Sequence, residues 1–96
     1  MWFIKPKYVV GSVYACQTGD HAGKLLIFMD DKVDQFGHYG FITTPELENL
    51  WIPEEQFDLG LENEIIEYVE KVPRFVRKTL KAKFEENEKT GLQSAN

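Results

Sequence analysis

The sequence predicts an α+β fold in which a small, bent antiparallel sheet or barrel precedes two C-terminal helices. Up to about residue 53, short runs rich in Val, Tyr and Ile are separated by turns that contain glycine, as is typical of short strands. After Asp58, apolar residues recur at helical spacing instead. Because 96 residues with a hydrophobic share of 43% suffice for one modest core, we expect a single domain. It would comprise a β-rich part (1–53), a helical part (58–88) and a frayed tail (89–96).

A hairpin is expected near the start of the chain. The run 7–17 is rich in Tyr and Val, and Gly11 interrupts it at the position of an expected bulge. A turn cluster, 18–23, follows, and the run 25–29 is continuously apolar. This order predicts two paired strands, the second of them buried.

The next two strands are expected at 39–43 and 50–52. The first is flanked by Gly37 and Gly40, and the second ends at Pro53, which cannot donate to a strand ladder. Four or five short strands with glycine-rich turns predict a strongly bent sheet.

The first helix is expected from Asp58 to about Val72. Asp58 is a suitable N-cap, and the acidic residues that follow it favour the positive end of the helix dipole. Pro73 should end or kink this helix. The apolar positions that predict the helix are Leu61, Ile65, Tyr68, Val69 and Val72.

The second helix is expected from Pro73 to about Glu88, with Pro73 as its first residue. Val76, Leu80 and Phe84 form an apolar stripe at a spacing of four. We expect these side chains to pack on the sheet or on the first helix, together with Val69 and Val72. If they do not, the exposed stripe predicts a homodimer interface.

The charge of the chain reverses abruptly between Glu70 and Lys71. The stretch 54–70 holds seven acidic residues and no basic one, whereas 71–83 holds six basic residues and no acidic one. One interpretation is that the acidic first helix lies antiparallel against the basic second helix and neutralises it. Another is that the basic residues bind phosphate or an acidic protein, and a third is an ordinary solvated face.

The segment 13–28 combines an expected strand at 13–16, the pattern Gly-x-x-x-Gly-Lys from Gly19 to Lys24, and an apolar strand at 25–28. This arrangement resembles the KOW motif of small SH3-like barrels. The resemblance covers roughly residues 8–53, and it departs from the pattern where Leu26 or Ile27 replaces an expected glycine. Such barrels usually bind RNA, nucleoprotein machinery or other proteins and are not enzymes. The resemblance therefore implies a binding module.

Catalytic and metal-binding patterns are poorly represented. Cys16, Asp20, His21 and His38 are the residues that suggest a nucleophile with a base, but a Cys-His pair also needs an orienting group and an oxyanion site. One cysteine and two histidines are too few and too scattered for zinc. We therefore expect no enzymatic activity, no cofactor and no metal.

Several features bear on where the chain works. A single cysteine cannot form an intrachain disulfide, which fits a reducing compartment. No apolar run has the length of a membrane span, and the N-terminus lacks the apolar core of a signal peptide. We expect a cytoplasmic protein with no membrane partner.

Aromatic residues near two glycines form a second candidate surface. Exposed aromatic side chains can stack bases or anchor a protein partner. We expect Phe41 to be buried and Tyr39 to lie opposite it, exposed. Phe36 and His38 complete this candidate set.

These observations favour a non-catalytic binding module, a small regulator or inhibitor of a larger protein or complex, acting as a monomer or homodimer. The short, acidic, aromatic-rich sequence is similar in style to bacteriophage accessory proteins, which often redirect host machinery. The alternative is a nucleic-acid-binding protein that uses the basic stripe of the second helix. The candidate partner-binding residues are Arg74, Arg77, Lys78, Lys81, Tyr39, His38 and Phe36.

Overall fold

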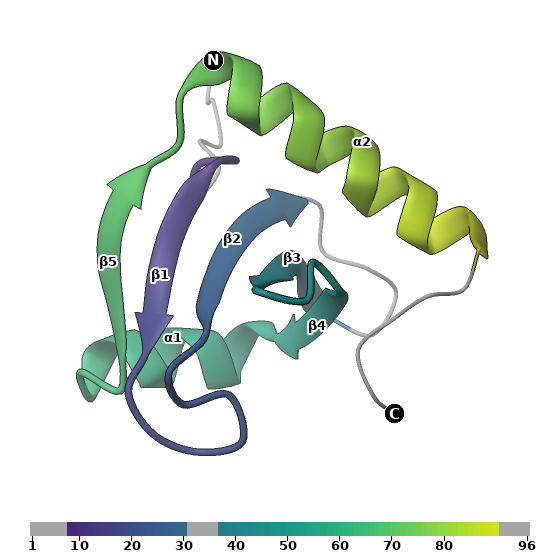
Figure 1. Cartoon of the computed structure of the whole chain (residues 1–96). Helices are drawn as coiled ribbons and strands as arrows, with labels where there is room; N and C mark the ends of the chain where they lie inside the picture. Colours follow the sequence, from purple (N-terminus) through teal and green to yellow (C-terminus); the bar gives the residue numbers. More distant parts are fainter. Residues whose placement is uncertain (1–7, 31–36, 91–96) are drawn as a thin grey trace, which may run out of the picture.

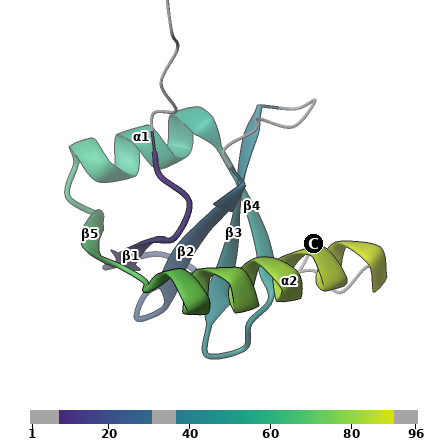
Figure 2. The same ribbon diagram turned by 90° about the horizontal axis from the view of Figure 1, so that it is seen from above.

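The computed structural model describes residues 8–30 and 37–90, and it shows an antiparallel sheet with one helix on each face (Figures 1 and 2). The five strands lie in the order β4-β3-β2-β1-β5, so the sheet is open, with β4 and β5 at its edges. The predicted α+β class and small antiparallel sheet are confirmed, whereas the described strands do not close into a barrel. The elements are β1 (Ser12–Cys16), β2 (Leu25–Asp30), β3 (His38–Thr44), β4 (Asn49–Pro53), α1 (Glu54–Glu62), β5 (Ile66–Lys71) and α2 (Arg74–Thr90).

Strands β1 to β4 follow one another as antiparallel neighbours, as the strand and turn pattern predicts. The first strand begins only at Ser12 because Gly11 has a φ of +96° and turns the chain. The amide of Gly11 donates to the carbonyl of Phe28 at 2.8 Å, and its carbonyl accepts from the amide of Val72 at 3.0 Å. Gly11 thereby ties the start of β1 to the end of β2 and to the residue after β5.

The predicted helix from Asp58 to Val72 is wrong, because the segment forms the second half of α1, a turn and β5. Helix α1 starts directly after Pro53, so Asp58 lies inside the helix and is not its N-cap. The chain turns at Glu64, which has a φ of +60°, and then runs along β1 as an edge strand. The ladder with β1 satisfies backbone groups that a helix would have left unpaired on that strand.

Pro73 separates a strand from a helix, and not one helix from another. Its carbonyl accepts a hydrogen bond of 2.9 Å from the amide of Arg77, which closes the first turn of α2. Helix α2 extends from Arg74 to Thr90, close to the predicted second helix.

Two apolar layers cover the two faces of the sheet. The layer under α1 is rich in aromatic side chains, which meet mostly edge to face. The layer under α2 is smaller and contains the one fully buried apolar residue of that helix, Phe84. The main members of the first layer are Tyr14, Phe28, Tyr39, Phe41 and Phe57, and those of the second are Val13, Ile27, Met29, Ile42 and Phe84.

The sheet lies between the two helices, so the first of the three interpretations of the charge reversal, an acidic helix against a basic one, is wrong (Figure 2). Helix α1 packs on one face and α2 on the other, which rules out the predicted antiparallel helix pair. The last acidic residues before the charge reversal, Glu67 and Glu70, instead stand exposed on the edge strand β5. The basic residues of α2 are therefore not neutralised by α1.

Candidate functional site

The four basic residues expected to bind a partner all lie on α2, but they differ in exposure. Arg74 and Lys78 are exposed, whereas Arg77 and Lys81 are half-buried. Spacings of three and four place all four on neighbouring parts of the helix surface. The structure thus brings them together, as the helical pattern predicts.

Two of these cations hold the fold together. The ammonium of Lys81 donates to the carbonyl of Met29 at 2.7 Å and lies 5.5 Å from the ring centroid of Phe84. The aliphatic stem of Arg77 packs on Gly11, where an added Cβ would come within 3.0 Å of Arg77 Cδ. Only Arg74 and Lys78 are therefore free of such contacts among the four, within the part of the chain described.

A shallow hollow of about 280 Å³ lies beside this basic stripe. Arg77, Lys78 and Lys81 line it, together with Val10, Ala82 and Glu85. Three cations around one hollow form a local positive potential on a chain with a net charge of −5.

Phe75 was missed as a candidate, although it is the most exposed large apolar residue in the described part of the chain. Its side chain is 74% exposed. Phe75 lies outside the apolar stripe by which α2 packs on the sheet. The helical pattern could therefore have predicted that its side chain faces solvent. We define the β5–α2 surface by Phe75 and four other exposed residues of the same segment, Val69, Lys71, Arg74 and Lys78. Glu70, which is also exposed, lies between Val69 and Lys71 in the sequence.

The aromatic candidates do not join this surface. Tyr39 is only 5% exposed and shares the α1 face of the sheet with Phe41, so its predicted exposure is wrong. Residues two apart in a strand point to the same face, which places Tyr39 beside Phe41 and not opposite it. His38 is half-buried at the start of β3, opposite Pro53, and Phe36 lies outside the described residues.

The environment of Tyr39 confirms its role in the core. Burial, followed by the nearby carboxylates of Glu54 and Asp58, raises the pKa of Tyr39 to about 12. Tyr8 donates a hydrogen bond to Asp58 in the same region, and its pKa is also raised, first by burial and then by that bond. These phenols remain protonated and do not act as bases near neutral pH.

A larger hollow lies on the α1 face of the sheet, and we call it the α1 pocket. Its volume is about 630 Å³, and it lies between the β1–β2 turn, α1 and the start of β5. Cys16 at the end of β1 and the turn residues Asp20 and His21 line it, so the structure does bring these three weak catalytic candidates together. The far wall is supplied by α1, which the sequence pattern misplaced.

The contacts of Cys16 do not match an activated nucleophile. Its thiol donates to the carbonyl of Thr18 at 3.2 Å and not to the imidazole of His21. The Nδ1 atom of His21 is buried and has no hydrogen-bond partner. Within the described ranges, no group of three or more Cys, His, Asp or Glu residues is arranged to hold a metal ion.

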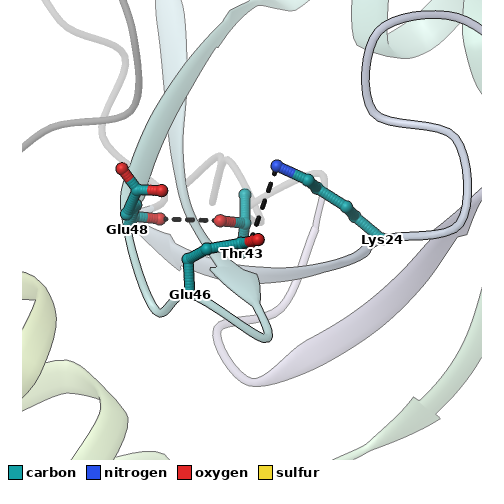
Figure 3. A network of polar contacts seen from close by, with 4 residues as sticks. All are labelled: Lys24, Thr43, Glu46 and Glu48. Carbon is teal, nitrogen blue, oxygen red and sulfur yellow. Dashed lines mark hydrogen bonds and ion pairs between the residues drawn. The ribbon is translucent and has the colours of Figure 1, made fainter.

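Lys24, at the end of the same turn, has a separate partner. Its ammonium pairs with Glu46 at 3.5 Å, close to the hydrogen bond of 3.2 Å from the Thr43 hydroxyl to the carbonyl of Glu48 (Figure 3). This pair connects the β1–β2 turn to the β3–β4 turn. Lys24 does not line the α1 pocket.

Comparisons with known proteins add no relative to these observations. No protein-family model, curated protein or solved structure matches the chain. In the two described stretches, no helix combines the length and the apolar character that crossing a bilayer requires.

Proposed function

We propose that the chain is a non-catalytic binding module, a small regulator or inhibitor that docks on an acidic surface of a larger protein through the β5–α2 surface. The single observation that carries this proposal is the 74% exposure of Phe75 among cations. Isolated exposed apolar residues are common, but Phe75 has Arg74 beside it and Lys78 one turn further along the helix.

An exposed aromatic side chain beside cations is typical of a hot spot for protein binding. Burying an exposed phenylalanine in a partner gains about 1.5–3 kcal/mol from its apolar area alone. The surrounding cations would steer the approach of an acidic partner and fix its orientation. Val69, which is 49% exposed on β5, is a further exposed apolar side chain of this segment.

The edge position of β5 adds a reason for a partner on this side. All residues from Glu67 to Lys71 are exposed, and the strand pairs with β1 alone. Its charged side chains and the irregular register opposite Val13 and Tyr14 discourage pairing with a second copy of the same strand. A different protein therefore fits this side better than a homodimer does. Its acidic groups would face Lys71 and the cations of α2, since Glu67 and Glu70 on β5 would repel them.

The test is capture of a protein from cell lysate with and without nuclease, compared across matched variants. Phe75→Ala and the double variant R74E/K78E should each lower recovery of the captured protein by about tenfold or more. Leu59→Ala removes a side chain that is 55% exposed on α1, and it should leave recovery unchanged. Undiminished capture by both β5–α2 variants would reject the proposed surface.

Nucleic-acid binding is a second candidate because Arg77, Lys78 and Lys81 converge on one hollow. It predicts that affinity falls steeply as salt rises, since phosphate contacts release counterions. Substitution of Arg77 or Lys81 would confound the test, because both also hold the fold. R74E/K78E avoids this problem. Recovery that collapses with nuclease, together with loss of RNA or DNA binding in R74E/K78E but not in Phe75→Ala, would favour this candidate.

A further inference from the structure

We propose that the α1 pocket binds a small organic amine, a positively charged nitrogen carried on an apolar body. This inference is independent of the β5–α2 surface, since the pocket opens on the α1 layer, on the opposite face of the sheet from α2. Three features of the pocket support this ligand: its size, the sign of the charges that line it, and the imidazole nitrogen of His21 that has no hydrogen-bond partner.

The size of the pocket matches a small organic ligand. Binding sites for such ligands usually measure about 300–1,000 Å³, and this one measures about 630 Å³. Its floor is apolar, because Leu26, Ile52 and Ile66 are buried side chains of the α1 layer. Leu59 and Ile65, at 55% and 38% exposed, are apolar groups that a ligand would cover.

The charges that line the pocket have one sign. Asp20 from the β1–β2 turn and Glu55 from the first turn of α1 supply carboxylates, and no lysine or arginine lies among the described lining residues. The nearest cation in the turn, Lys24, is paired with Glu46 (Figure 3). A ligand with a positive charge is therefore favoured over one with a negative charge.

The hydrogen-bonding groups that line the pocket also favour a ligand that donates hydrogen bonds. Both carboxylates accept hydrogen bonds only. The Nδ1 atom of His21 is buried without a partner, so no hydrogen bond fixes this nitrogen in its present orientation. In the tautomer that carries its proton on Nε2, Nδ1 is a further acceptor, which an N–H group of the ligand can satisfy if the ring turns toward the pocket.

Two probes with the same apolar body and opposite charge test this inference. 4-Phenylbutylamine and 4-phenylbutanoate are titrated into the isotope-labelled full chain, and amide resonances are followed by NMR. We expect the amine to shift resonances of the β1–β2 turn and α1 in a saturable way, with a dissociation constant of about 1 mM. The carboxylate should bind about tenfold more weakly or not at all.

Variants then locate the site and its charge preference. D20N/E55Q removes both carboxylates and should weaken binding of the amine about tenfold. E62Q/E64Q removes two exposed carboxylates from the end of α1 and the following turn, outside the pocket, and should leave binding unchanged. Equal affinity of the amine for wild type and D20N/E55Q would overturn the inference, as would equal binding of the two probes.

Cys16 gives an independent readout, because it is the sole cysteine of the chain and lines the pocket. Alkylation of its thiol, followed by mass spectrometry, should slow when the amine is bound. E62Q/E64Q should show the same protection. A rate of alkylation that a saturating amine leaves unchanged would place the probe elsewhere and would reject the pocket as its site.

Discussion

The Lys81 ammonium donates a hydrogen bond of 2.7 Å to the main-chain carbonyl of Met29, where β2 and β3 slip out of register. The ladder pairs Phe28 with Phe41 and Asp30 with Gly40, so Met29 has no direct partner on β3. Met29 is fully buried, and an unpaired carbonyl there would be costly. Lys81, which the sequence pattern assigns to a partner-binding stripe, thus donates to a backbone carbonyl of the sheet.

We expect Lys81→Met to destabilise the fold. The substitution keeps the apolar stem but leaves the Met29 carbonyl without its donor, which should cost about 1–3 kcal/mol. Urea unfolding followed by circular dichroism measures the change in the free energy of unfolding. Lys78→Met, one turn earlier and exposed, is the matched control and should change stability by less than about 0.5 kcal/mol. Equal stability of the two variants would show that the bond contributes nothing.

Asn49 and Asn87 should be energetically coupled, because they form the buried polar connection between β4 and α2. Asn49 donates to the carbonyl of Phe84 at 2.9 Å and to Glu88 at 2.8 Å, while Asn87 donates to Asn49 at 3.0 Å and to the carbonyl of Leu47 at 2.9 Å. Either alanine variant leaves buried groups unpaired, at a cost of about 1–3 kcal/mol. The double variant should cost less than the sum, by about 0.5 kcal/mol or more, in a double-mutant cycle of urea unfolding. Strict additivity would contradict the coupling.

Stability should fall as pH rises above 10, because Tyr39 keeps its proton longer in the folded chain. Its pKa is raised from 10.0 to about 12, first by burial and then by nearby carboxylates. Above pH 10 the unfolded chain releases this proton first, so the stabilisation is complete below pH 10 and is lost as pH rises toward 12.

Urea unfolding at about pH 9 and about pH 11 measures this loss. Tyr39→Phe has no proton to release at this position and should lose less stability across the interval than wild type does. Tyr68→Phe alters a side chain that is 54% exposed and should behave like wild type. An identical loss in wild type and Tyr39→Phe would assign the effect to other groups.

The sequence pattern predicted the elements with a strong hydrophobic signal, either a continuous apolar run that is buried on both faces or an apolar stripe with a helical period. Strands β2 and β3 and helix α2 each bury continuous or periodic apolar residues, and all three lie close to the expected ranges. Strand β5 was missed because it is an edge strand with one buried residue, Ile66, so the alternation typical of a strand is weak. Its apolar residues happened to match a helical period.

The α1 pocket could be predicted only in part. The turn at 18–23, which follows Cys16 and carries His21, was expected. The opposite wall comes from α1, which starts right after Pro53 and tolerates Gly60 near its end. Close packing against β5 favours glycine at this position, because an added Cβ would lie 2.6 Å from Cδ1 of Ile66. Ile66 is not part of α1, so the local sequence pattern of the helix does not reveal this contact.

Gly40 shows the same kind of requirement under α2, and Gly40→Ala should destabilise the chain. An added Cβ would lie 2.8 Å from Phe84 Cζ, closer than Cβ atoms approach other atoms in folded proteins. It would also lie 3.0 Å from two ring atoms of Trp51, which is tighter than most such contacts. The two rings pack against each other with centroids 5.6 Å apart, so neither can retreat without disturbing the other. We expect a loss of about 1–3 kcal/mol in urea unfolding.

A compensating substitution distinguishes this clash from a general effect of alanine in a strand. Phe84→Leu removes the ring atoms nearest to Gly40, so Gly40→Ala should cost less in the Phe84→Leu background than in wild type. Tryptophan fluorescence reports the same contact, since Gly40→Ala should shift the emission of Trp51 more in wild type than in the Phe84→Leu chain. A cost that is the same in both backgrounds would show that Phe84 is not the obstacle, and it would leave Trp51 as the neighbour that demands glycine.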